Sequence, residues 1–92
     1  MAIEAGAFLI DVRTPSEYAE GFIPGATNID LRTLADNTSL IPTDTQVIVY
    51  CKSGWPAALS ESILQVLGFS NVKAFPGSYA AWTAAGEPVA TP

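Results

Sequence analysis

Three short, mostly apolar runs, each bounded by turn or helix-start residues, constrain the fold of this chain more than any other feature. They are residues 8–12, 46–50 and 72–75, and the second is β-branched throughout its centre. Short runs of this kind are typical of strands buried on both faces of a sheet. Because helix signals lie between them, we predict an α/β domain with a mainly parallel sheet. A length of 92 residues suits one small domain.

The first helix signal follows residues 8–12 directly. Thr14 is a suitable N-cap, Pro15 suits the first helical position, and Glu17 completes a capping box with Thr14. Gly21 should end this short helix in the left-handed conformation. A helix that begins immediately after a strand is the pattern expected of a β–α unit.

The remaining elements are predicted from spacing. A very short strand is expected at 27–29, a helical turn at 31–34, and mostly loop over 36–45. A longer helix should run from about Pro56 to Leu67, with one apolar face formed by Leu59, Ile63, Val66 and Leu67. A last short helix holds Tyr79 and Trp82, which we expect to serve as packing residues.

One cysteine and no histidine exclude several kinds of site. A single thiol forms no intramolecular disulfide and no multi-cysteine zinc site, and no Cys-His or Ser-His-Asp arrangement can be built. Four basic residues face nine acidic ones, for a formal net charge of −5, so the footprint of a nucleic-acid binder is missing. No apolar run is long enough to span a bilayer. The compartment stays open, with the cytosol slightly favoured because a thiol stays reduced there most easily.

The segment after residues 46–50 is the candidate site. Cys51 comes directly after the predicted strand, and ligands of parallel α/β sheets bind beyond the carboxyl ends of the strands. Ser53 and Gly54 let the backbone curl, and the free N–H groups of the following helix favour an anion. We therefore expect the Cys51 thiol to be partly deprotonated and nucleophilic, with the charge of Lys52 beside it.

Each of these residues also has a structural interpretation. Cys51 taken alone could be a small buried hydrophobe, but the strand–loop–helix context favours a site. For Arg13 and Asp11 we favour structural roles, in which Arg13 pairs with Glu17 and Asp11 ties a loop to the end of the sheet. Trp55 is expected to be exposed. It could form an apolar wall for a ligand, contact a partner protein, or simply pack over the loop.

Several motifs follow one another from about residue 8 to the end of the chain. They are FLIDVRTPSEY at 8–18, GFIPGATNI at 21–29, VYCKSG at 49–54, LGFSNV at 67–72, PG at 76–77, AW at 81–82 and GEPV at 86–89. Their order and spacing resemble those of the rhodanese (sulfurtransferase) domain. The resemblance implies a three-layer α/β/α fold with a mostly parallel sheet.

The resemblance also implies a chemistry. Cys51 would take a sulfane sulfur from a donor such as thiosulfate and pass it, through a persulfide, to a thiol or cyanide. The loop would hold the outer sulfur with backbone N–H groups, and its residues are Lys52, Ser53, Gly54, Trp55, Pro56 and Ala57. The partners implied are a small sulfur-containing anion and a thiol acceptor, and no metal or organic cofactor is implied.

Three departures from the pattern modify this expectation. Pro56 stands where the family loop often has Arg, so one cation and one N–H donor are lost and thiosulfate capture should be weaker. Phe22 stands where many relatives have His, although Pro24 and Gly25 should preserve the turn. Only residues 1–7 precede the first predicted strand, where such domains usually have a further strand and helix. This implies a piece of a longer, or tandem, protein.

Two alternative functions were weighed. A cysteine-dependent phosphatase or arsenate reductase on the same fold needs Arg six positions after the cysteine to clamp an oxyanion, and position 57 is Ala57. We therefore disfavour it. A non-catalytic rhodanese module for docking or sensing belongs to a different class, and Pro56 and the low charge content favour it. Sulfur transfer remains the preferred hypothesis, and uptake of a sulfur atom by Cys51 would discriminate the two.

Overall fold

The computed structural model describes residues 7–52, 55–75 and 78–91, with the side chains of residues 55–58 left aside. The elements follow in the order β1 (Phe8–Asp11), α1 (Pro15–Glu20), β2 (Thr27–Asn28), the 3-10 helices η1 (Leu31–Asp36) and η2 (Thr38–Leu40), β3 (Val47–Tyr50), α2 (Trp55–Val66), β4 (Val72–Ala74) and α3 (Ser78–Ala84). Across these described ranges, no helix has the length and apolar character needed to cross a membrane.

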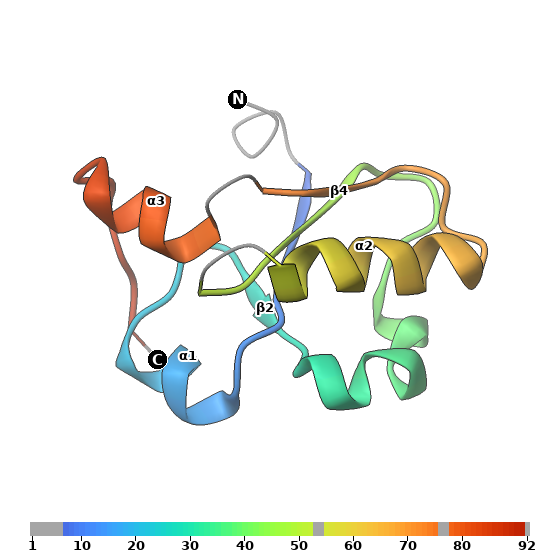
Figure 1. Ribbon diagram of the computed structural model, residues 1–92, viewed down its shortest axis with the longest axis horizontal. Coiled ribbons are helices and arrows are strands. Elements are labelled where there is room, and N and C mark those ends of the chain that lie inside the picture. Colours follow the sequence, from blue (N-terminus) through green and yellow to red (C-terminus); the bar gives the residue numbers. More distant parts are fainter. Residues whose placement is uncertain (1–6, 53–54, 76–77, 92) are drawn as a thin grey trace.

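All four strands run parallel in one sheet, in the order β2-β1-β3-β4. The central strands β1 and β3 pair along their whole length, from Phe8 opposite Val47 to Asp11 opposite Tyr50. This confirms the predicted α/β class with a mainly parallel sheet. In Figure 1, α1 and α3 lie on one side of the strands, and α2 lies with η1 on the other.

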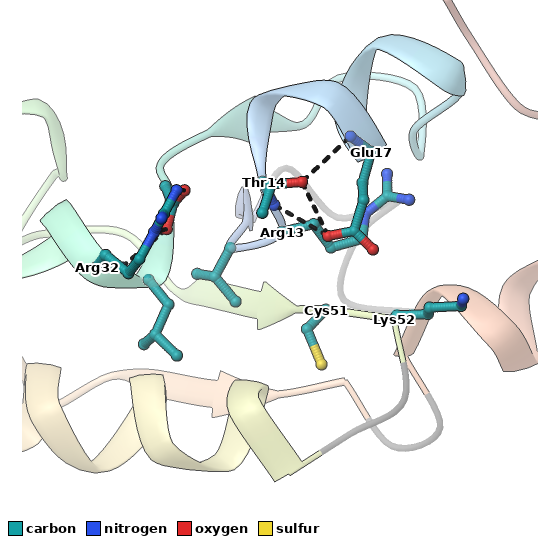
Figure 2. Close-up of a pocket in the computed structure, with 9 residues that line it drawn as sticks. Arg13, Thr14, Glu17, Arg32, Cys51 and Lys52 are labelled. Atoms are coloured by element: carbon teal, nitrogen blue, oxygen red, sulfur yellow. Dashed lines mark hydrogen bonds and ion pairs between the residues drawn. The ribbon is translucent and has the colours of Figure 1, made fainter.

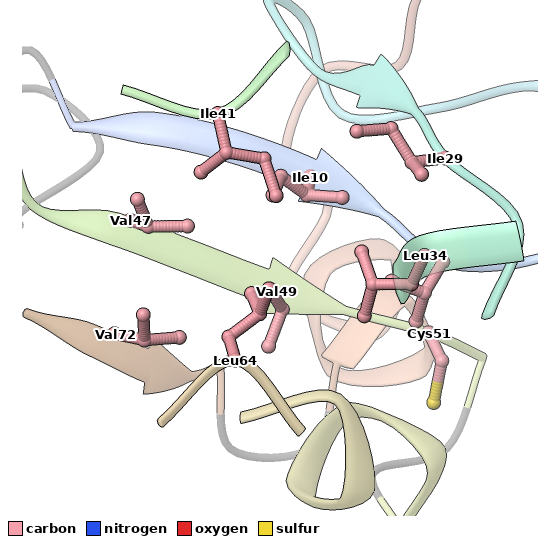
Figure 3. Packing of buried hydrophobic residues seen from close by; sticks show 10 residues of the cluster. Ile10, Ile29, Leu34, Ile41, Val47, Val49, Cys51, Leu64 and Val72 are labelled. Carbon is pink, nitrogen blue, oxygen red and sulfur yellow. The ribbon is translucent and has the colours of Figure 1, made fainter. Parts of the chain in front are cut away.

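Two hydrophobic clusters separate these layers. Because side chains alternate along a strand, β1 and β3 supply one set of residues to each face. Toward α2 and η1 they contribute Ile10, Val47 and Val49, which pack with Leu34 and Leu64 (Figure 3). The opposite face gathers Leu9, Ile48 and Tyr50, with Tyr18, Tyr79 and Trp82 packed against them. Helices on both faces confirm the three-layer α/β/α fold and the packing roles of Tyr79 and Trp82.

The predicted capping box of α1 is confirmed, and its predicted ending is corrected. The Thr14 side chain accepts from the Glu17 backbone, and the Glu17 side chain accepts from the Thr14 backbone. Gly21 follows the helix with φ 155° and ψ 146°, which is not the left-handed helical conformation. The chain leaves the helix extended because the next residue, Phe22, pairs with Ala90 in an antiparallel bridge, with hydrogen bonds of 2.9 and 2.8 Å. A side chain does not fit at Gly21, because a Cβ there would lie 2.8 Å from Val89 Cγ1 and 2.9 Å from the Tyr79 hydroxyl.

The predicted apolar face of α2 is confirmed at Ile63, which packs against the core, and is wrong at its other three positions. Val66 is 87% exposed, Leu67 49% and Leu59 41%, whereas Ser60 and Leu64 are completely buried. Positions one residue apart differ by about 100° around a helix axis, so a small rotation changes which side chains are buried. Leu64 belongs to the cluster that includes Leu34 of η1 and the sheet residues, and this packing leaves Val66 in solvent.

Candidate active site

Strand β3 delivers Cys51 to the carboxyl end of the sheet. Tyr50 is the last residue of the strand and faces α1 and α3, so the alternation of side chains directs Cys51 to the opposite face. Its thiol points toward the first turn of α2 (Figure 2). Cys51 is 3% exposed and packs at the rim of the cluster under α2.

The backbone of Cys51 is fixed by α3. The amide of Cys51 donates to the Ser78 hydroxyl at 3.1 Å, and its carbonyl accepts from the Tyr79 amide at 2.8 Å. The next carbonyl, of Lys52, accepts from the Ala80 amide at 3.0 Å. Ser78 is fully buried and has a positive φ of 52°, which is uncommon for a residue with a side chain. This positioning role could not be predicted from the sequence, because nothing local in the sequence links Ser78 to Cys51.

A cavity of about 310 Å³ opens beside Cys51. Residues from three separate segments line it, namely Val12, Arg13, Thr14 and Glu17, then Asp30, Leu31 and Arg32, then Cys51 and Lys52. Three of the four basic residues of the chain are therefore gathered at one cavity. In the view of Figure 2, Arg32 and Lys52 lie on opposite sides of Cys51, and α1 begins above it.

Arg13 is held inside the protein by Asp11. Asp11 accepts from the Arg13 backbone at 2.9 Å, from its Nε at 3.0 Å and from its Nη2 at 2.7 Å. The Nη2 also donates to the Gly21 carbonyl at 2.6 Å, and the guanidinium lies 4.0 Å from the centre of the Tyr79 ring. The Tyr50 hydroxyl completes the network by donating to Asp11 at 2.7 Å. Burial disfavours the charged guanidinium, but Asp11 outweighs this effect and the pKa of Arg13 is raised.

This geometry corrects one prediction and confirms another. Arg13 does not pair with Glu17, because Asp11 lies two residues away and forms a buried ion pair with it. Glu17 instead accepts from the backbone and hydroxyl of Thr14, both at 3.1 Å. Asp11 does tie a loop to the end of the sheet, as predicted. Glu17 therefore contributes a negative charge to the cavity wall that is not neutralised by Arg13.

A second ion pair forms the opposite wall of the cavity. Arg32 donates to Asp30 from its backbone at 2.9 Å, its Nε at 3.2 Å and its Nη2 at 2.8 Å. The side chain of Arg32 is 77% exposed and that of Asp30 is 12% exposed. The hydrogen bonds from Arg32 lower the pKa of Asp30. Neither residue was a site candidate from the sequence, because both precede Cys51 by about twenty positions.

The predicted loop residues are placed only in part. Lys52 is exposed and lines the cavity, as expected of a charge beside Cys51. Ser53 and Gly54 lie outside the described residues. Trp55, Pro56 and Ala57 belong to the first turn of α2, so Trp55 is helical and not part of the loop. Their side chains, including the predicted exposure of Trp55, lie outside the described groups, and their site roles stay predictions.

The cavity places a nucleophile at its floor. The thiol is nearly covered, and Cys51 is among the residues that line the cavity. With Asp11, which pairs with Arg13, the cavity gathers three basic and three acidic side chains, whereas the rest of the chain carries six acidic residues against Lys73. The net negative charge of the chain therefore lies outside the cavity. Among the described residues, no group of three His, Cys, Asp or Glu side chains could hold a metal ion.

Comparisons with known proteins identify similar sequences. The rhodanese-like domain family model matches residues 1–85. A sulfurtransferase of Allochromatium vinosum is 34% identical over 84 residues, which is 91% of this chain and 78% of that protein. The thiosulfate sulfurtransferase GlpE of Pseudomonas entomophila is 35% identical over 77 residues, covering 84% of this chain and 71% of that one.

Solved structures show the same fold. A rhodanese-related protein from Thermoplasma volcanium superposes with a TM-score of 0.89 and 27% identity, covering 97% of this chain and 88% of that chain. The reduced CoADR-RHD protein of Bacillus anthracis gives a TM-score of 0.86 and 32% identity over 95% of this chain. The match spans only 16% of the Bacillus chain, so in that protein the similar domain is part of a much larger molecule.

Proposed function

This chain belongs to the rhodanese-like domain family, and from that membership we propose that it is a sulfurtransferase that carries a sulfane sulfur as a persulfide on Cys51. The observation that carries the proposal is the position of the only thiol of the chain at the floor of a cavity with Arg13, Arg32 and Lys52 in its walls. The activity of the named relatives supports thiosulfate as a donor.

The first half-reaction loads the cysteine. The Cys51 thiolate attacks the outer sulfur of thiosulfate, a new S–S bond forms, and the S–S bond of the donor breaks. The electron pair of the broken bond leaves on sulfite. Lys52 is the exposed cation nearest to the thiol in sequence, and we assign to it the attraction of the anionic donor into the cavity.

The second half-reaction returns the enzyme to its starting state. An acceptor thiolate attacks the outer sulfur of the Cys51 persulfide, the acceptor leaves as a persulfide, and Cys51 is released as a thiolate. The sulfur atom is transferred with no net oxidation of the protein. The contacts from Ser78, Tyr79 and Ala80 hold the backbone of Cys51 and Lys52 in one place through both steps.

Pro56 sets a limit on the first step. Proline offers neither a cation nor an N–H donor, so the start of α2 binds an anion less strongly than it would with an arginine at this position. We infer slow loading from thiosulfate and faster loading from persulfides, whose reactive sulfur needs no anion clamp.

The test is uptake of one sulfur atom by Cys51. The protein is incubated with thiosulfate, and separately with inorganic polysulfide, and its intact mass is measured under non-reducing conditions. We expect an added mass of one sulfur in the wild type, with none in Cys51→Ser. Because oxidation to a sulfinic acid adds nearly the same mass, the adduct must also disappear on treatment with dithiothreitol or cyanide. If neither thiosulfate nor polysulfide gives a removable adduct, sulfur transfer is contradicted and the docking module is favoured.

A further inference from the structure

Two of the three basic side chains at the Cys51 cavity already have carboxylate partners. Arg13 pairs with Asp11 at 2.7 Å, and Arg32 pairs with Asp30 at 2.8 Å. Each arginine is neutralised within the protein, so neither pair adds net charge to the cavity. The charge that a reactant meets there is therefore determined by the charged side chains without such a partner.

Lys52 and Glu17 are the other two charged side chains in the cavity wall. Within the part of the chain that the structure describes, neither forms an ion pair. Lys52 is exposed and Glu17 is half-buried. Because both line one cavity of about 310 Å³, the two opposite charges act on the same reactant. Salt screens charges so close together only in part, since the Debye length is about 8 Å at physiological ionic strength.

The capping box of α1 holds the Glu17 carboxylate at this wall. Its Oε1 accepts from the Thr14 backbone amide and from the Thr14 hydroxyl, both at 3.1 Å. Its Oε2 forms no hydrogen bond among the described residues. In Figure 2 the carboxylate lies between α1 and the segment that carries Cys51 and Lys52. One oxygen is thus tied to the start of the helix, and the negative charge remains beside the cavity.

We propose that Glu17 is a specificity-determining residue that disfavours doubly charged sulfur donors at Cys51 relative to donors without charge near the reacting sulfur. A repulsive group of this kind discriminates between ligands without any new attractive contact. Thiosulfate carries two negative charges, so Glu17 opposes the attraction that Lys52 exerts on it. The proposal rests on the proposed function, since it names the class of donor. It adds a cause of slow loading from thiosulfate that is independent of Pro56.

The test compares two alkylating reagents of nearly the same size. Iodoacetate carries one negative charge and iodoacetamide carries none, and Cys51 is the only thiol of the chain, so intact mass follows both rates. The ratio of the two rates cancels any change in the thiol itself, because both reagents react with the thiolate. In Glu17→Gln we expect the ratio of the iodoacetate rate to the iodoacetamide rate to rise about threefold at low salt. Added salt should reduce this rise.

Two further variants serve as controls. Glutamine also completes a capping box, so Glu17→Gln should keep the fold. Glu20→Gln removes one negative charge from an exposed residue of the same helix outside the cavity, and it should leave the ratio unchanged. Lys52→Gln removes the opposing charge and should lower the ratio about threefold. An unchanged ratio in Glu17→Gln, or an equal rise in Glu20→Gln, would overturn the proposal.

Sulfur loading separates this proposal from the proposed function. Relative to alkylation by iodoacetamide, loading from thiosulfate should accelerate in Glu17→Gln by more than alkylation by iodoacetate does, because thiosulfate carries two negative charges. If Cys51 takes up no sulfur but the alkylation ratio rises in Glu17→Gln, sulfur transfer is wrong and the charge discrimination stands. If Cys51 loads but the ratio stays constant, the role of Glu17 is wrong and sulfur transfer stands.

Discussion

Asp11-Val12-Arg13-Thr14 and Asp30-Leu31-Arg32-Thr33 are nearly the same four residues in two regions of the molecule. In each, the arginine backbone donates to the aspartate two positions earlier at 2.9 Å, and the guanidinium folds back onto the same carboxylate. The local geometry therefore follows from the pattern itself. The first pattern connects the end of β1 to α1, whereas the second begins at Asp30, the N-cap of η1, and continues into that helix.

The surroundings of the two pairs differ. The Arg13 and Asp11 side chains are 6% and 0% exposed, and Tyr50, Gly21 and Tyr79 contact them from distant parts of the chain. The guanidinium of Arg32 has no such additional contact among the described residues and is 77% exposed. The same hydrogen-bonded unit is thus a buried structural tie in one place and a pair with a solvent-exposed arginine in the other.

The cause lies in the order of the strands. β1 is central in the sheet, so the segment after it is covered by the Gly21 loop on the face that carries α3. β2 is an edge strand, and the segment after it is open on one side. Burial makes the first pair unable to release its arginine, since an unpaired buried charge is strongly disfavoured. In the second pair only the arginine is exposed, so the Arg32 guanidinium stays in contact with solvent while Asp30 is largely covered.

The largest expected contrast is in stability. Asp11→Asn leaves the Arg13 charge buried without its carboxylate and should lower the free energy of unfolding by about 3–5 kcal/mol. Asp30→Asn should lower it by less than about 1 kcal/mol, because the Arg32 guanidinium that loses its carboxylate is 77% exposed and stays solvated, and because asparagine caps a helix as well as aspartate. Urea unfolding at neutral pH measures both. Equal losses would refute the distinction, whereas an unfolded Asp11→Asn protein beside a folded Asp30→Asn protein would support it.

A smaller loss is expected at the loop that covers the buried pair. Gly21→Ala forces a side chain into φ 155° and against Val89 and Tyr79, so it should destabilise the protein by about 2–4 kcal/mol. The comparison variant is Gly25→Ala, where φ is 90° and no atom lies within 4 Å of the added Cβ, with an expected loss of about 1–2 kcal/mol. Thermal unfolding distinguishes the two, and indistinguishable midpoints would show that the packing around Gly21 relaxes.

The smallest effect concerns the tyrosine that ties β3 to the buried pair. Tyr50→Phe removes the donor to Asp11 and leaves the Ile23 amide without its 3.1 Å acceptor. We expect this change to lower the free energy of unfolding by about 1–2 kcal/mol. Burial, and then the charge of Asp11, raise the pKa of Tyr50 far above its usual value. A raised pKa contributes stability that is complete below about pH 10, the usual value for tyrosine, and is lost at higher pH.

The pH dependence follows from that sign. The stability advantage of the wild type over Tyr50→Phe should be constant at neutral pH and shrink as the pH rises beyond about 10. Urea unfolding across this range measures the advantage. An advantage that stays the same at alkaline pH would show that the Tyr50 phenol ionises in the folded protein much as it does in the unfolded chain.

Much of the fold could be predicted because its signals are local. The strand runs, the capping box of Thr14 and Glu17, and the position of Cys51 after a strand depend on neighbouring residues alone. The buried face of α2 could not be predicted in this way. The residues four and three positions before Leu64 are Ser60 and Glu61, so the apolar pattern does not mark the face that packs with Leu34 of η1.

The candidate site was predicted at its centre and missed at its walls. The sequence pointed to Cys51 and Lys52, both of which line the cavity. It missed Arg32, Asp30 and Ser78, because each reaches the cysteine through pairing of strands or packing of helices and not through proximity in the chain.

What the sequence determined by itself is the order of strands and helices, a thiol at the end of β3, and two identical folded-back Asp–Arg units. These are set by interactions over a few residues. Only the tertiary structure decided which of the two units is buried and brought both arginines to the cavity beside Cys51. That choice depends on whether the preceding strand lies at the centre or the edge of the sheet, a property that no short stretch of residues encodes.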